Sequence, residues 1–155
     1  MTMQSALIVD DHPLFCDALA MTLKAFVGIG RIDTADRIDT AVERLGGGPL
    51  PDVVVLDLNL PDVHGMEGLV RIRQVAGAVP VVVVSSMADA RVIGAALKAG
   101  AAGFVPKHSQ REVFRAAFDA VDAGRIYTPD TYVPLPDTAP ATAQEDALKR
   151  LSLLT

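Results

Sequence analysis

The chain has 155 residues, half of them apolar, which is enough for one domain with a full hydrophobic core. Its formal net charge of −5 disfavours direct binding of nucleic acid by these residues. No apolar run approaches the roughly 20 residues that a membrane helix needs, and residues 1–5 lack the basic residues of a secretory signal, so we expect a soluble, cytoplasmic protein. Cys16 is the only cysteine, which excludes an intrachain disulfide and a cysteine-based zinc site.

Short apolar runs alternate along the chain with segments of helical periodicity. The expected strands are residues 7–9, 31–34, 53–57, 79–84 and 103–106, and the expected helices are residues 13–26, 35–45, 66–75, 90–99 and 109–124. Asp89 is expected to cap the fourth helix, and Ser109 with Glu112 has the spacing of a capping box for the fifth. Five strands alternating with five helices predict a doubly wound α/β fold around a parallel sheet.

The composition changes after Gly124, where prolines are interspersed with Thr, Asp and Ala as in a linker. Residues 145–155 regain a helical pattern, with leucines three residues apart and no partner surface within the segment. We therefore expect a main domain over residues 1–125, a linker over residues 126–144, and over residues 145–155 the helical start of a further domain that is truncated here.

Four of the expected strands end in polar functional groups. These groups are Asp10 and Asp11 after the first strand, Asp57 at the end of the third, Ser85 after the fourth and Lys107 after the fifth. Asp and Ser also favour turns, which would explain one or two of these positions, but Lys is a poor turn former. In a parallel sheet all four strand ends lie along one edge, and ligands of open α/β sheets bind in the crevice beyond that edge.

The chemistry of these side chains indicates phosphoryl transfer. Three neighbouring carboxylates repel one another unless a cation lies among them, and Mg²⁺ or Mn²⁺ is the dication suited to oxygen ligands. A hydroxyl and an ammonium would complete the neutralisation of a phosphoryl group. Asp57 is then the candidate nucleophile, which would form an acyl phosphate.

Four motifs resemble the receiver domain of two-component response regulators. They are V-D-D-H-P-L-F at residues 9–15, V-V-V-L-D-L-N-L-P-D-V-H-G at residues 53–65, V-V-V-S at residues 82–85 and G-A-A-G-F-V-P-K at residues 100–107. The resemblance covers about residues 5–125. The D-D-H-P-L-F opening and the G-F-V-P-K ending further resemble the NarL/FixJ branch, whose members carry a C-terminal LuxR-type helix-turn-helix. The resemblance implies a flavodoxin-like (βα)5 fold with strand order 2-1-3-4-5.

The resemblance also implies a role for each matching residue. Asp57 is the phosphoacceptor, Asp11 a direct metal ligand and Asp10 a ligand acting through water. The backbone carbonyl of Asn59 completes the Mg²⁺ shell. The residues that bind the phosphoryl group and switch with it are Ser85, Lys107 and the aromatic Phe104.

The implied function is a switch rather than an enzyme. A sensor histidine kinase would phosphorylate Asp57, and the added charge would change the surface over residues 90–105, which in this family controls dimerisation or the release of a DNA-binding domain. The output would be transcription, with DNA bound only by a C-terminal domain absent from these residues.

The sequence departs from the family pattern at three places. Phe104 lacks the hydroxyl of the Tyr that is common at this position, so its switching would depend on packing alone. Ser86 replaces a small apolar residue and would alter access to Asp57. Pro106 precedes Lys107, whereas many receivers have a proline after the lysine.

Two other functions remain open at this point. A Mg²⁺-dependent phosphatase of the haloacid dehalogenase type also uses an aspartyl nucleophile at a strand end, but it needs a second Asp two residues later, where this chain has Asn59. A stand-alone receiver would act as a protein-interaction module without DNA-binding output. His12, next to the acids, is expected to orient its loop rather than bind metal.

Overall fold

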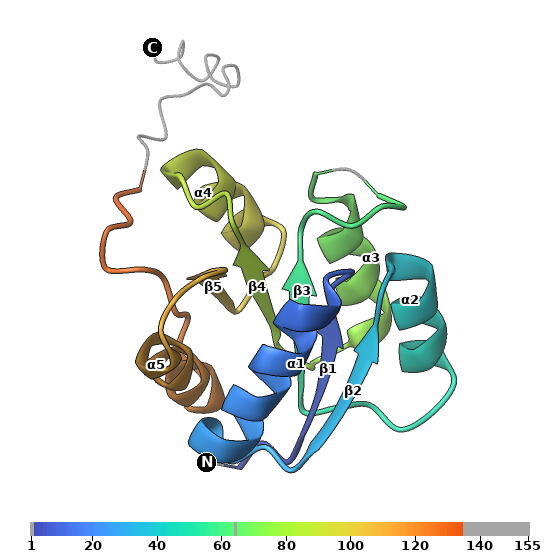
Figure 1. Cartoon of the computed structure of the whole chain (residues 1–155). Helices are drawn as coiled ribbons and strands as arrows, with labels where there is room; N and C mark the ends of the chain where they lie inside the picture. Colours follow the sequence, from blue (N-terminus) through green and yellow to red (C-terminus); the bar gives the residue numbers. More distant parts are fainter. Residues whose placement is uncertain (1, 64, 135–155) are drawn as a thin grey trace, which may run out of the picture.

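The computed structural model of the chain describes residues 2–63 and 65–134 (Figure 1). The sheet strands are β1 (Ser5–Val9), β2 (Arg31–Ala35), β3 (Val53–Asp57), β4 (Val81–Ser85) and β5 (Gly103–Pro106). The helices are α1 (Pro13–Thr22), α2 (Ile38–Gly46), α3 (Glu67–Ala76), α4 (Ala90–Lys98) and α5 (Arg111–Asp122), with a π-helical turn, η1 (Leu23–Val27), extending α1. The helix expected over residues 145–155 lies outside the described residues.

The five strands form one parallel sheet in the order β2-β1-β3-β4-β5, which confirms the predicted doubly wound, flavodoxin-like fold. The register aligns Asp57 with Val84 on β4, and Ser85 with Pro106 on β5. A parallel register of this kind brings the carboxyl ends of neighbouring strands to the same edge. The polar residues that end the strands therefore meet there.

Helices cover both faces of the sheet (Figure 1). On one face, Val54, Leu56 and the other inward-facing residues of their strands pack against α2, α3 and α4. On the opposite face, Val53, Val55 and their neighbours pack against α1, η1 and α5. Because successive side chains of a strand point to opposite faces, a continuous valine run such as that of β3 contributes to both cores.

The N-terminus of α4 has the cap that the sequence predicts, whereas the N-terminus of α5 does not. The Asp89 carboxylate accepts a hydrogen bond from the backbone N–H of Val92, as expected for the cap of α4. The predicted capping box of α5 is wrong. Gln110 is the N-cap residue, and the Ser109 hydroxyl instead donates to the carbonyl of Pro106 in the preceding turn.

The residues after α5 pack back on the sheet. Tyr127 pairs in parallel with Gly103, its carbonyl accepts a hydrogen bond from the N–H of Phe104, and its own N–H donates to the carbonyl of Ala102. Tyr132 packs against the hydrophobic core on the α4 side. The first part of the expected linker thus covers the outer edge of β5. Within the described part of the chain, no helix has the length and apolar character needed to cross a membrane.

Candidate functional site

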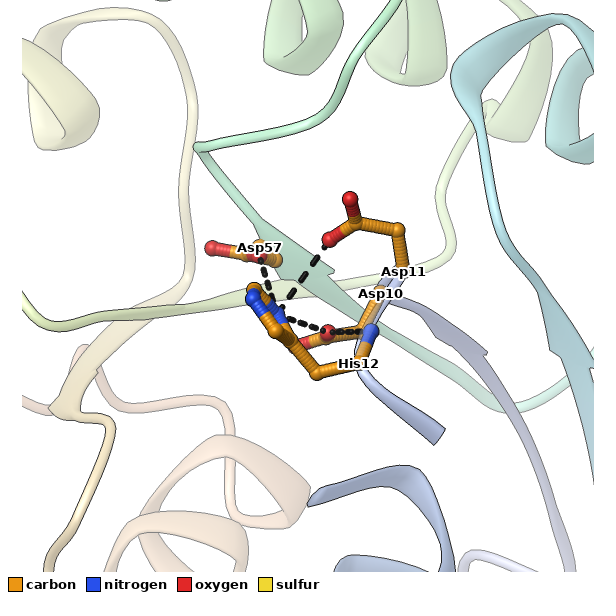
Figure 2. A group of neighbouring side chains, drawn as sticks. All are labelled: Asp10, Asp11, His12 and Asp57. Carbon is orange, nitrogen blue, oxygen red and sulfur yellow. Dashed lines mark hydrogen bonds and ion pairs between the residues drawn. The ribbon is translucent and has the colours of Figure 1, made fainter. Parts of the chain in front are cut away.

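The three predicted carboxylates meet at the carboxyl edge of the sheet. Asp10 and Asp57 are almost fully buried, with exposed fractions of 4% and 2%, whereas the side chain of Asp11 is about one third exposed. Asp10 follows β1, where its backbone N–H donates to the carbonyl of Ala35 and so continues the pairing with β2. Asp10, Asp11 and Asp57 are called the acidic cluster below (Figure 2).

Lys107 supplies a buried cation to the acidic cluster. Its Nζ atom lies 3.1 Å from Asp10 Oδ2 and 3.4 Å from Asp57 Oδ2. The backbone N–H of Lys107 donates to the carbonyl of Ser85, which holds the end of β5 beside the end of β4. The ammonium also lies 4.7 Å from the centre of the Phe15 ring on α1, close enough for a cation–π interaction. Sequence reasoning missed this contact of Phe15, because it joins residues 92 positions apart.

Of the other predicted site residues, Ser85 and Asn59 lie at the carboxyl edge of the sheet, whereas Phe104 lies in the core. Ser85 is buried at the end of β4, and its hydroxyl accepts a hydrogen bond from the N–H of Met87. The backbone N–H of Asn59 donates to Asp57 Oδ1 over 3.1 Å, while the Asn59 residue is exposed. Phe104 is fully buried in the core on the α4 face of the sheet, away from the surface.

The protonation of Asp57 depends on opposing influences. Burial raises the pKa of this carboxyl, and the nearby Asp10 carboxylate raises it further. The N–H of Asn59 and the ammonium of Lys107 act in the opposite direction, but the net result is a pKa above the ordinary value. An additional cation beside Asp57 would favour the ionised form, which is the nucleophilic one.

Two oxygens of the acidic cluster fit a role as metal ligands. Asp10 Oδ2 and Asp11 Oδ1 are buried and accept no hydrogen bond from the described residues, although Lys107 lies near the first and the His12 ring near the second. Buried carboxylate oxygens without donors are costly unless a cation compensates them. Hard dications such as Mg²⁺ prefer oxygen ligands of this kind. The donor set is therefore suited to the ion that the sequence predicts.

His12 approaches the acidic cluster more closely than its expected role in orienting the loop requires. Its backbone N–H donates to Asp10 Oδ1 over 2.8 Å, which does fix the loop. Its ring Nδ1 lies 3.0 Å from the same oxygen and 3.2 Å from Asp11 Oδ1, and Figure 2 shows the ring turned toward the acids. The adjacency of His12 to two aspartates was the signal in the sequence that pointed to this contact.

Cys16 lies beneath the acidic cluster as a buried thiol. Its Sγ donates to the carbonyl of Asp10 over 3.4 Å. Burial, assisted by the Asp10 carboxylate, raises the pKa of the thiol to about 11, so it stays protonated at neutral pH. Cys16 therefore acts as a small packing group, as expected from the acids around it.

Comparisons with known proteins agree with this arrangement. The family described as "Response regulator receiver domain" matches residues 6–119. The chain is 38% identical over 128 residues to the glycerol metabolism activator of Pseudomonas putida, covering 82% of this chain and 58% of that protein. It is 31% identical over 121 residues to the transcriptional regulatory protein MctR of Rhizobium johnstonii, covering 78% of this chain and 56% of that protein. The chain thus spans less than two thirds of these curated relatives.

Solved structures of LuxR-family regulators have the same fold. A LuxR family DNA-binding response regulator from Silicibacter pomeroyi superposes with a TM-score of 0.73 at 31% identity, covering 84% of this chain and all of that one. A two-component response regulator of the LuxR family from Aurantimonas sp. SI85-9A1 gives a TM-score of 0.73 at 29% identity, covering 97% and 99% of the two chains. The chain belongs to the response regulator receiver domain family and is related within it to bacterial transcription regulators of the LuxR/NarL type.

Proposed function

We propose that Asp57 accepts a phosphoryl group from a sensor histidine kinase, in a reaction that uses a Mg²⁺ or Mn²⁺ ion. The observation that supports this most directly is the position of the Lys107 ammonium, 3.4 Å from Asp57 Oδ2, beside two buried carboxylate oxygens that accept no hydrogen bond from the described residues. Asp10, Asp11, Asp57 and the backbone carbonyl of Asn59 would hold the metal ion. The chain is then a regulatory phosphoacceptor and not an enzyme that turns over a substrate.

The proposed reaction transfers the phosphoryl group from nitrogen to oxygen. A carboxylate oxygen of Asp57 forms a bond to phosphorus while the bond from phosphorus to the imidazole nitrogen of the kinase breaks. The imidazole keeps the electron pair of that bond and takes up a proton. Lys107 and the hydroxyl of Ser85 neutralise and bind the oxygens of the new acyl phosphate. When bound, the metal ion supplies positive charge that favours the ionised form of Asp57 and shields the incoming phosphoryl oxygens.

Phosphorylation would alter the surface of α4 and β5. The Ser85 hydroxyl now accepts from Met87 N–H and would turn toward the phosphoryl group. Phe104 has no hydroxyl, so its contribution to the switch would be a change of packing in the core beneath α4. This surface would then control homodimerisation.

We propose transcription as the output, on the strength of the relatives. Two of them are named as a metabolism activator and a transcriptional regulatory protein, and both are longer than the matched region. In this proposal residues 1–125 are the receiver and residues 126–144 a linker. Residues 145–155, which lie outside the described part of the structure, would lead into a DNA-binding helix-turn-helix domain. The protein would act in the cytoplasm, where its kinase presents the phosphoryl group.

Intact-mass measurements test the proposed reaction. The chain is incubated with acetyl phosphate, or with phosphoramidate as a second donor, in Mg²⁺ or in EDTA. We expect one labile phosphoryl adduct that requires both Mg²⁺ and Asp57, so it should be absent from Asp57→Asn. Asp33→Asn is the matched control, because Asp33 is an exposed carboxylate on β2 that contacts Arg44 and not the acidic cluster, so the adduct should be unchanged.

Two results would contradict the proposal. One is an adduct of equal yield in Asp57→Asn, which would place the acceptor elsewhere. The other is the absence of any adduct from both donors in Mg²⁺, which would mean that Asp57 is not a competent nucleophile in this chain.

A further inference from the structure

We propose that the ring Nδ1 of His12 is a ligand of the metal ion, so that His12 adds affinity for transition-metal dications such as Co²⁺ but little for Mg²⁺. The inference rests on the proposed function to the extent that it places the ion within the acidic cluster. His12 would add a nitrogen ligand to a set of ligands that are otherwise oxygens, and this changes which metal ions the site binds best.

The distances around His12 are compatible with a coordination shell. Nδ1 lies 3.0 Å from Asp10 Oδ1, 3.2 Å from Asp11 Oδ1 and 3.9 Å from Asp57 Oδ2. One donor atom from each of the four residues lies within 4.8 Å of all the others. With metal–ligand bonds of about 2.1 Å, adjacent ligands of an octahedral ion lie about 3 Å apart and opposite ligands about 4.2 Å apart. The spacings between Nδ1 and the three carboxylate oxygens therefore fall in the range expected between ligands of one ion.

The immediate surroundings of Nδ1 also favour a cation at this point. Lys107 Nζ lies 3.0 Å from Nδ1, and an ammonium can only donate, so this contact requires the lone pair of the nitrogen. The contact with Asp10 Oδ1 requires a proton on the same nitrogen. Because Nδ1 carries either a lone pair or a proton, it cannot accept from Lys107 and donate to Asp10 at the same time. A metal ion that binds the lone pair and the carboxylates removes this conflict. It also compensates Asp10 Oδ2 and Asp11 Oδ1, which accept no hydrogen bond from the described residues, although Lys107 Nζ lies 3.1 Å from the first and His12 Nδ1 3.2 Å from the second.

The type of ligand determines which ions gain affinity. Carboxylate and carbonyl oxygens suit Mg²⁺, whereas imidazole adds affinity for Co²⁺, Ni²⁺ and Zn²⁺. The acidic cluster alone would bind Mg²⁺ or Mn²⁺ in the ordinary way. Participation of His12 would raise the affinity for Co²⁺ and leave that for Mg²⁺ nearly unchanged, because Mg²⁺ gains little from a nitrogen ligand.

The position of His12 in the fold allows a clean substitution. His12 is the N-cap residue of α1, it has an extended backbone, and its side chain makes no capping hydrogen bond. Asn is among the most favourable N-cap residues, so His12→Asn should keep α1 intact. It also replaces the ring nitrogen by an amide oxygen, which is a ligand that Mg²⁺ accepts. His108→Asn is the control, because His108 is exposed and is not among the residues of the acidic cluster or its contacts.

Calorimetric titration of the 155-residue chain with Mg²⁺ and with Co²⁺ tests the inference. In His12→Asn we expect the Co²⁺ affinity to fall by at least about tenfold and the Mg²⁺ affinity to change by less than about twofold. His108→Asn should match the parent with both ions. Proton NMR of the Co²⁺-loaded protein should show hyperfine-shifted imidazole signals that are lost in His12→Asn and kept in His108→Asn.

The outcomes separate this inference from the proposed function. If Asp11→Ala abolishes binding of both ions while His12→Asn leaves the ratio of Co²⁺ to Mg²⁺ affinity unchanged, the histidine is not a ligand and the proposed metal site stands. If neither ion binds the parent, or if binding survives Asp11→Ala, both the inference and the proposed metal site are overturned.

Discussion

At the scale of single residues, Asp57 is subject to two opposite requirements. Burial favours its neutral form, whereas attack on phosphorus requires the ionised form. Lys107 and the N–H of Asn59 offset part of the effect of burial, but the pKa of Asp57 remains raised. In the proposed reaction, the metal ion would therefore favour the ionised form of Asp57 as well as bind the phosphoryl group.

The raised pKa of Asp57 leads to a prediction about stability and pH. A carboxyl with a raised pKa in the folded state contributes stability below its unfolded pKa of about 3.9, and this contribution is lost as pH rises through the folded value. Asn can still accept the hydrogen bond from Asn59 N–H and does not ionise. In EDTA, Asp57→Asn should therefore melt above the parent at pH 7, and the difference should shrink toward pH 4. Thermal unfolding followed by circular dichroism measures this, and a difference independent of pH would contradict it.

Metal binding should reverse the order of the melting temperatures, so that the parent melts above Asp57→Asn. An ion that binds only the folded state raises the free energy of unfolding, and the increase is about 2.7 kcal/mol when the free ion is at 100 times its Kd. Mg²⁺ should therefore raise the Tm of the parent, and raise that of Asp57→Asn by much less. An equal shift in both proteins would show that the ion binds elsewhere. Asp33→Asn serves again as the control, with an unchanged shift in Tm.

At the scale of elements, the cap of α4 provides a prediction with an internal control. Asp89 accepts a hydrogen bond from Val92 N–H at the start of this helix, so Asp89→Ala should cost about 1 kcal/mol in the free energy of unfolding. Glu112 was expected to close a capping box on α5, but the N-cap residue there, Gln110, makes no side-chain capping bond. Glu112→Gln should therefore change stability by less than about 0.5 kcal/mol. Urea unfolding measures the free energy of unfolding of both variants, and an equal loss in Asp89→Ala and Glu112→Gln would contradict the observed caps.

The contact between α2 and α3 depends on a glycine. A Cβ added at Gly68 on α3 would lie 2.9 Å from Ile38 Cδ1 and 3.2 Å from Val63 Cγ2. Because two buried residues would have to move, Gly68→Ala should cost about 1–3 kcal/mol despite the better helix propensity of Ala.

Gly94 on α4 is the matched control for Gly68. Its added Cβ would meet only the Tyr132 hydroxyl at 3.6 Å, which is an ordinary contact. Gly94→Ala should therefore be neutral or stabilise by up to about 1 kcal/mol. Urea unfolding of the two variants measures the difference. A similar loss in both would mean that the close approach at Gly68 does not limit packing.

At the scale of the whole molecule, the receiver fold includes residues beyond α5. Tyr127 occupies the outer edge of β5 and satisfies the N–H of Phe104 and the carbonyl of Ala102. A chain ending after Gly124 exposes these groups and part of the core beneath Tyr132, whereas a chain ending after Pro134 does not. We expect a lower Tm for the shorter chain, and equal Tm values in a scanning calorimeter would contradict this role of residues 125–134.

Much of the fold was predictable because its signals are local. The valine runs of β3 and β4 and the helical spacing between them gave the elements within a few residues, and the alternation of strand and helix predicted a parallel sheet. The resemblance to receiver domains supplied the strand order, which the alternation alone does not determine. A parallel sheet then places the ends of its strands at one edge, so the meeting of Asp10, Asp11, Asp57, Ser85 and Lys107 followed from the pattern.

The sequence by itself determined the elements, the parallel sheet and the carboxylates at its edge. Hydrophobic periodicity and the ends of strands depend only on residues that are close together in the sequence. Tertiary structure alone decided three further features. The ring of His12 turns toward the acids, the Ser109 hydroxyl bonds to Pro106 instead of capping α5, and Tyr127 pairs with β5. The physical reason is the same in each case. A side chain or an unpaired backbone group takes the best partner that the folded chain brings near, and no local pattern specifies that partner.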